Sequence, residues 1–109
     1  MKKSILISTS YSATHCWPDC SIEEVSFLKH PHRHVFHVVM RFEVSHNNRD
    51  IEFIQKKILV DDYLSNTWNE KDVGNLSCED MAEILFNRFE ADYVSVLEDN
   101  ENGAEVYKS

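Results

Sequence analysis

Apolar and polar positions alternate along two segments in the first half of the chain. Over residues 5–13, Ile5, Ile7 and Thr9 alternate with residues of the opposite face, which is typical of a β-strand. The clearest alternation puts two imidazoles and then five apolar side chains on one face: His32, His34, Phe36, Val38, Met40, Phe42 and Val44. Because strand side chains alternate between the two faces of a sheet, residues 32–44 are predicted to form a strand with one apolar face.

Loop and turn signals lie between and after these strands. Residues 16–31 contain both prolines of the chain, Pro18 and Pro31, and are predicted to form a long loop with a turn of helix around residues 22–27. Loops of this length in a small domain are usually functional or mobile. Residues 46–50, His-Asn-Asn-Arg-Asp, are predicted to form a polar turn.

Helical spacing dominates the next part of the chain. Apolar residues recur at helical intervals from Glu52 to about Trp68, which predicts a first helix. A second helix is predicted to begin at the near capping box formed by Ser77 and Asp80, ahead of apolar residues at three- and four-residue spacing. Alternation returns at residues 93–97 and, after a turn at residues 100–103, at residues 104–107.

The order of these elements predicts the fold class. Two strands, two helices and two strands (ββααββ) are typical of an α+β domain with a four-stranded antiparallel sheet and both helices on one face. We expect residues 1–109 to form this single domain. Its other sheet face would carry Val35 and Val39, so we expect the chain to associate with copies of itself.

Composition narrows the classes of function. The 109 residues include 11 Lys and Arg against 19 Asp and Glu, a net charge of −8, so neither a nucleic-acid partner nor an anionic membrane surface is expected. No apolar run approaches the roughly 20 residues of a spanning helix, and the N-terminus turns polar too soon for a signal peptide. The chain has only two glycines, so it contains no glycine-rich loop of the kind that binds phosphate. We therefore expect a cytoplasmic protein whose three cysteines stay reduced.

Histidines are concentrated near the start of the chain, where five of the six occur before Val38: His15, His30, His32, His34 and His37. His32 and His34 project to the same side of a strand, and His15 joins them if the first two strands pair. Three imidazoles with one open position form a Lewis-acid zinc site, so His15, His32 and His34 are predicted to bind Zn²⁺. The alternative is a group of surface or partly buried histidines with no ligand.

The residues around these histidines resemble a known zinc motif. Ser12–His15 and His32–Phe36 are similar to the motif of the 6-pyruvoyltetrahydropterin synthase and 6-carboxytetrahydropterin synthase family, in which a His near the end of the first strand joins a His-Gly-His pair. Further segments resemble the family's two helix entries and the strand that ends in a glutamate: Ile51–Phe53, Asn75–Glu79 and Val94–Glu98. The resemblance covers nearly the whole chain. It implies the tunnelling fold and a homo-oligomeric ring, such as a hexamer, with active sites between subunits.

The resemblance also implies a chemistry. Members of this family split the side chain of 7,8-dihydroneopterin triphosphate in pterin or 7-deazaguanine (queuosine) synthesis, with zinc polarising side-chain oxygens while a general base moves protons. Glu98 matches the glutamate that anchors the pterin ring through the ring's N–H donors. A carboxylate that accepts two such bonds makes a strong and directional contact. The implied activity is that of a lyase, and the implied partner is a small pterin-like molecule.

The chain departs from the family at the catalytic positions. The His-Gly-His pair is replaced by His-Arg-His, with Arg33 in the middle, and Leu28 takes the place of the catalytic Cys. Cys20 is then the candidate nucleophile or base. Cys16 is the weaker candidate, because it directly follows a metal ligand and its side chain should point away on a regular strand.

The other proton-transfer groups are displaced as well. The family's Asp-His pair is reduced to Asp61, and its His is lost to Asp62 or deleted. His30 is the candidate substitute from the loop, and Glu23 or Glu24 is the nearest match to a Glu used by some branches. Three hypotheses remain open: a zinc-dependent relative of the pterin synthases, a catalytically degenerate protein that binds or sequesters a pterin- or purine-like ligand, and a small assembly domain whose histidines are incidental.

Overall fold

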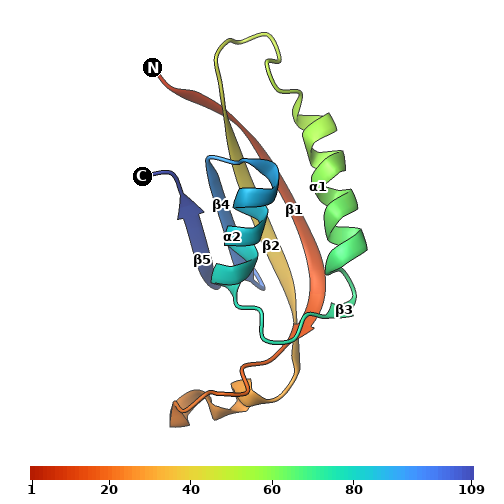
Figure 1. The fold of residues 1–109 in the computed structure, drawn as a ribbon, viewed down its shortest axis with the longest axis vertical. Helices are drawn as coiled ribbons and strands as arrows, with labels where there is room; N and C mark the ends of the chain where they lie inside the picture. Colours follow the sequence, from red (N-terminus) through yellow and green to blue (C-terminus); the bar gives the residue numbers. More distant parts are fainter.

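Five strands form one mixed sheet in the computed structural model, which describes residues 1–109 (Figure 1). The strands are β1 (Lys3–His15), β2 (His32–Val44), β3 (Lys71–Asp72), β4 (Tyr93–Glu98) and β5 (Asn102–Tyr107). They are ordered β3-β1-β2-β4-β5, and all neighbours are antiparallel except β3, which runs parallel to β1. The α+β class predicted from the pattern is confirmed.

Strand β3 corrects the expected four-stranded antiparallel sheet. It pairs with Ala13 and Thr14 of β1, and the flanking main chain extends the contact. The N–H of Glu70 donates to the carbonyl of Ser12 (2.6 Å), and the N–H of Val73 donates to the carbonyl of Thr14 (2.8 Å). A strand of two residues is too short to show an alternation of apolar and polar positions. It forms because the chain runs alongside the end of β1 after α1.

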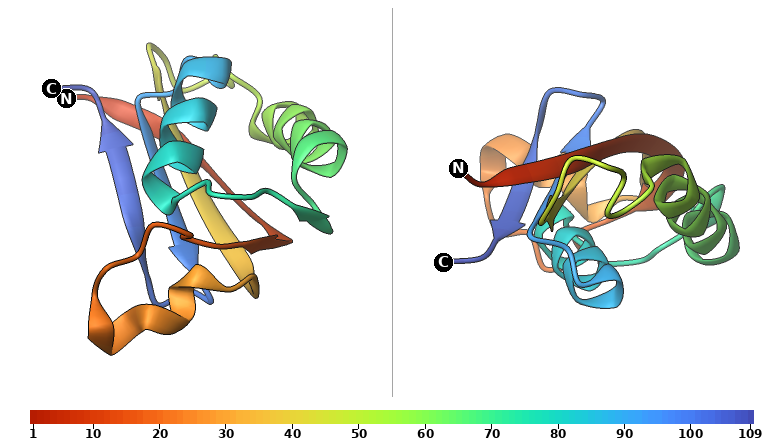
Figure 2. Two further views of the ribbon diagram at one scale, coloured as in Figure 1. Left: turned by 60° about the horizontal axis from the view of Figure 1, so that its bottom comes forward. Right: turned by 90° about the horizontal axis from the view of Figure 1, so that it is seen from above.

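Two α-helices and one 3₁₀ helix complete the structure: α1 (Phe53–Thr67), α2 (Cys78–Phe89) and η1 (Glu23–Lys29). Helix α1 begins where the Glu52 carboxylate accepts the N–H groups of Ile54 and Gln55. Helix α2 begins at a complete capping box between Ser77 and Asp80, as the sequence predicts. Both α-helices lie on the same face of the sheet (Figure 2). No helix has the length and apolar character that crossing a membrane requires.

The apolar face of β2 forms the centre of the core. Phe36, Val38 and Met40 are fully buried, as the alternation predicts, and belong to one cluster with Met81 and Leu85 of α2. Burying such side chains contributes about 1.5–3 kcal/mol each to folding. The same face of β2 continues into its two leading histidines, which therefore lie at the end of the core and not on an open surface.

Candidate metal centre

Three histidines converge where β1 ends and β2 begins. His15 is the cross-strand partner of His32, and His34 follows two residues later on the same face. One ring nitrogen from each lies within 4.8 Å of those of the other two. His15 is buried, and the other two are partly exposed. The pairing of two predicted strands thus brings the three predicted ligands together.

The Nδ1 atom of each imidazole is already bonded to an oxygen. In His15 it lies 2.8 Å from the carbonyl of Leu76, in His32 it lies 2.8 Å from the carbonyl of His30, and in His34 it lies 2.6 Å from Oδ2 of Asp99. Carbonyl and carboxylate oxygens only accept, so each Nδ1 carries the proton. The Nε2 atom of each neutral ring then offers its lone pair, which is the arrangement found in metal-binding histidines.

Glu98 lies beside two of these Nε2 atoms, those of His15 and His34. Its Oε2 is 3.0 Å from Nε2 of His15, and its Oε1 is 3.6 Å from Nε2 of His34. The Nε2 atom of His15 is buried and makes no hydrogen bond. A lone pair that faces a carboxylate oxygen is repulsive unless a cation lies between them. This unsatisfied buried nitrogen is the strongest sign that the centre is built around a positive ion.

The donor set fits a divalent cation. Three neutral imidazoles and a nearby carboxylate are ligands that zinc takes readily. Imidazole also suits copper, iron and nickel, so the residues define a candidate metal site without identifying zinc.

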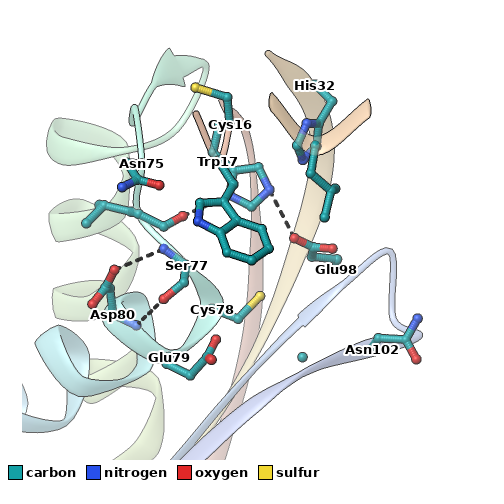
Figure 3. A pocket seen from close by; sticks show the side chains of 14 residues that line it. Cys16, Trp17, His32, Asn75, Ser77, Cys78, Glu79, Asp80, Glu98 and Asn102 are labelled. Atoms are coloured by element: carbon teal, nitrogen blue, oxygen red, sulfur yellow. Dashed lines mark hydrogen bonds and ion pairs between the residues drawn. The ribbon is translucent and has the colours of Figure 1, made fainter. Parts of the chain in front are cut away.

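A cavity of about 510 Å³ opens beside the centre (Figure 3). The start of the loop after β1, the N-terminal end of α2 and the turn between β4 and β5 enclose it, with these lining residues: His15, Cys16, Trp17, Leu28, His32, Asn75, Leu76, Ser77, Cys78, Glu79, Asp80, Glu98, Asn102 and Gly103. In the close view the Trp17 indole lies across the cavity between Ser77 and Glu98. An aromatic side chain and several polar groups around one cavity are typical of a small-molecule site.

The charge that lines the cavity is negative. Glu79, Asp80 and Glu98 contribute carboxylates, and no Lys or Arg is among the lining residues. Burial, together with the charges of Glu98 and Glu79, raises the pKa of the Cys78 thiol to about 12. Cys78, the first residue of α2, lies in the cavity wall. At neutral pH it is a thiol and neither a base nor a nucleophile.

Cys20 does not line the cavity. Its side chain is buried, and Sγ lies 3.7 Å from the carbonyl of Ile22 and 3.6 Å from the carbonyl of Val25, both in its own loop. Cys16 does line the cavity, although in the close view its sulfur points away from the labelled histidine His32 (Figure 3). Cys20 is therefore not placed where its proposed role needs it, whereas the Cys16 side chain points away from His32 as its position after His15 predicts.

The other two proposed proton-transfer residues also lie outside the cavity lining. Asp61 accepts a hydrogen bond from the Thr9 hydroxyl (2.5 Å), and Thr9 is six residues along β1 from His15, a distance of about 20 Å in a strand. His30 is exposed, and its link to the centre is the carbonyl that holds His32.

Asp99 is the residue of the centre that the sequence did not reveal. It follows Glu98 at the start of the turn between β4 and β5, where its Oδ1 accepts the N–H of Val35 (3.1 Å) and its Oδ2 bonds to His34. The hydrogen bond from His34, followed by that from Val35, lowers the pKa of Asp99. An acidic residue in a polar turn is an ordinary feature of a sequence, so no local pattern singled it out.

Two polar residues of β2, Arg33 and His37, face away from the centre. Arg33 makes a two-pronged ion pair with Glu70, whose oxygens lie 2.8 and 3.0 Å from Nη2. His37 alternates with the buried Phe36 and Val38 and so lies on the sheet face without helices. Arg33 is therefore committed to a surface pair and is not among the residues that line the cavity.

Comparisons with known proteins identify a similar fold but no family. No family model matches the chain, and no curated protein matches it. The structure is similar to the crystal structure of the uncharacterized protein WS1659 from Wolinella succinogenes, with a TM-score of 0.75 and 11% sequence identity. The match covers 100% of this chain and 99% of that one. At this identity the likeness shows a shared fold and nothing about activity.

Proposed function

We propose that the chain is a zinc-dependent relative of the 6-pyruvoyltetrahydropterin and 6-carboxytetrahydropterin synthases with the tunnelling fold. Its proposed activity is lysis of the side chain of dihydroneopterin triphosphate or a related pteridine. One observation carries the proposal: three clustered imidazoles have Nδ1 bonded to acceptors, and two of them, His15 and His32, line a cavity. The resemblance of the residues around these histidines supplies the substrate class.

Each part of the site has a proposed role. His15, His32 and His34 hold the ion, which when bound polarises side-chain oxygens of the substrate. Glu98 accepts the N–H donors of the ring from the cavity wall. Trp17 covers the ring with its indole, since flat aromatic groups favour stacked or edge-on contacts.

Proton transfer needs groups beyond those that line the cavity. Among the three proposed residues, His30 is linked to the centre through its carbonyl, which accepts a hydrogen bond from His32. Cys20 requires movement of its loop, and Asp61 requires a neighbouring copy to present it. The proposed lyase reaction therefore requires an assembly of several copies of the chain.

The proposed assembly is a homo-oligomeric ring. The sheet face without helices exposes Leu6 and Val35, and the β5 edge has no strand beside it. Such surfaces favour association with another copy. Light scattering should give a mass that is a multiple of the chain mass, and a monomer at micromolar concentration would contradict the ring.

A second candidate is a protein that binds a pterin- or purine-like ligand without turning it over. The observation in its favour is that none of the three proposed proton-transfer residues, Cys20, Asp61 and His30, lines the cavity. His15 and His32 are assigned to the ion, and the Cys78 thiol has a pKa of about 12.

One experiment separates the candidates. The metal-loaded protein is incubated with 7,8-dihydroneopterin triphosphate, binding is measured by calorimetry, and products are separated by chromatography. Turnover that is lost in His32→Ala supports the lyase. If turnover is also lost in Cys20→Ala, Cys20 takes the role of the family's catalytic cysteine. Tight binding without turnover favours the binding protein. If the protein takes up neither metal nor ligand, the three histidines have no binding role and both candidates are contradicted.

The proposed role of Glu98 has its own control in the same cavity. Glu98→Gln keeps the size of the side chain but cannot accept two N–H bonds with a full charge, so pterin binding should weaken. Glu79→Gln removes a similar charge from another part of the wall. Equal losses in the two variants would mean that the ring responds to overall charge and has no specific anchor at Glu98.

A further inference from the structure

We propose that Glu98 is the fourth ligand of the metal in the ligand-free protein, so that the site is closed before a ring enters. The inference rests on the proposed function only in requiring a metal at the three histidines. It changes the role of Glu98, which in the proposed function contacts the ring and not the ion.

The distances at Glu98 are those of ligands that share one ion. Zinc lies about 2.0–2.2 Å from nitrogen and oxygen ligands, so tetrahedral neighbours are about 3.4 Å apart. The Glu98 oxygens lie 3.0 Å from Nε2 of His15 and 3.6 Å from Nε2 of His34. The two distances belong to different oxygens of the carboxylate, and each is within about 0.4 Å of the tetrahedral spacing. The carboxylate is therefore placed to join the ion from the side of His15 and His34.

A hydrogen bond does not account for the same contact. Nδ1 of His15 bonds to the carbonyl of Leu76, and its buried Nε2 makes no hydrogen bond even though Oε2 is 3.0 Å away. Ligands of one ion lie side by side and do not point at each other. A short distance without a hydrogen bond is what neighbouring ligands show.

The backbone around Glu98 holds the carboxylate in this place. Glu98 pairs with Phe36 across β2 and β4, and the next residue, Asp99, bonds to His34 from its other side. Its side chain is about one-third exposed and lines the cavity. The carboxylate is thus reachable by a ring in the cavity, and a ring that takes it as an anchor opens the fourth position of the metal.

Cobalt substitution tests this proposal with a signal that does not depend on catalysis. Co²⁺ replaces zinc in the wild-type protein, in Glu98→Ala and in the control Glu79→Ala, and sodium azide is titrated while the visible spectrum is recorded. We expect azide to leave the wild type and Glu79→Ala unchanged, because no position is open, and to shift the spectrum of Glu98→Ala. Zinc affinity, measured by chelator competition, should fall by about tenfold or more only in Glu98→Ala, since losses around metal sites are typically 10- to 100-fold.

The possible failures are distinguishable. An azide shift in the wild-type protein would show an open three-histidine site, which overturns the closed site and leaves the proposed function standing. Failure of every protein to retain Co²⁺ or Zn²⁺ would overturn both. If Glu98→Ala does not fold, the wild-type azide titration and the ligand count from X-ray absorption decide the matter without a variant.

Discussion

The imidazole of His34 is held at Nδ1 by Asp99, whose Oδ2 lies 2.6 Å away. The preceding residue, Glu98, approaches Nε2 of the same ring. Two consecutive residues at the end of β4 thus fix the orientation of one imidazole and the environment of its free nitrogen. A carboxylate bonded to Nδ1 also raises the basicity of the ring toward a metal.

Removing Asp99 should weaken the metal site without removing a ligand. In Asp99→Ala the ring of His34 loses its orienting acceptor, and we expect zinc affinity to fall by about 10- to 100-fold. Chelator competition measures the change. Glu101→Ala, an exposed position in the same turn, is the control. Equal affinities in Asp99→Ala and the wild type would contradict the role given to Asp99.

Binding of a pterin ring should free a coordination position of the metal for small anions. Unsubstituted pterin, added to the Co²⁺ protein, should draw the Glu98 carboxylate to its N–H donors. Azide should then shift the visible spectrum, although azide alone does not. Pterin that binds, as shown by calorimetry, and leaves the cobalt site insensitive to azide would mean that Glu98 does not exchange between the ion and the ring.

Cys78 should be slow to react with alkylating agents. Its pKa of about 12 leaves very little thiolate at pH 8, so iodoacetamide should modify it about a thousandfold more slowly than a free cysteine with a pKa near 8.5. Peptide mass spectrometry follows Cys78 and the partly exposed Cys16 in one sample. Modification of Cys78 as fast as that of Cys16 would argue against the burial and negative charge described for the cavity wall.

Asp92 should contribute stability that disappears in acid. Its carboxylate accepts the N–H of Glu43 (2.6 Å) and pairs with Lys108 (2.8 Å), and these contacts lower its pKa. A lowered carboxyl pKa stabilises the fold above the ordinary value of about 3.9 and ceases to do so as the pH falls through the lowered value.

Asp92→Asn tests that contribution. Its melting temperature should be below that of the wild type at pH 7, by an amount that corresponds to about 1 kcal/mol, and the difference should shrink by pH 3. Asp62→Asn, at an exposed position of α1, is the matched control. A difference between Asp92→Asn and the wild type that is equally large at both pH values would contradict the assignment.

The parts of the fold with a clear period could be predicted from the sequence. The face of β2 follows from alternation over 13 residues, and the start of α2 follows from the Ser77–Asp80 capping box. The three histidines could be grouped because strand geometry puts His32 and His34 on one side and the end of β1 opposite them. Each of these rests on a local rule that the tertiary structure did not override.

The remaining features depend on tertiary contacts between segments that lie far apart in the sequence, or on the conformation of a loop. Strand β3 is too short to show a period, and the acceptor for His15 is the main-chain carbonyl of Leu76, which no side-chain pattern can reveal. Asp99 reaches His34 because β4 pairs with β2 in one particular register. The loop turns Cys20 into its own interior, which its spacing from His15 does not predict.

Metal content is the most direct test of the central claim. The protein is saturated with zinc, freed of excess by gel filtration and analysed by mass spectrometry for metal per chain, alongside His15→Ala, His32→Ala and the control His37→Ala. We expect one zinc per chain in the wild type and in His37→Ala, and loss of that zinc in the other two variants. A wild-type protein that retains no metal, or an His32→Ala variant that retains it fully, would contradict a metal centre at these three histidines.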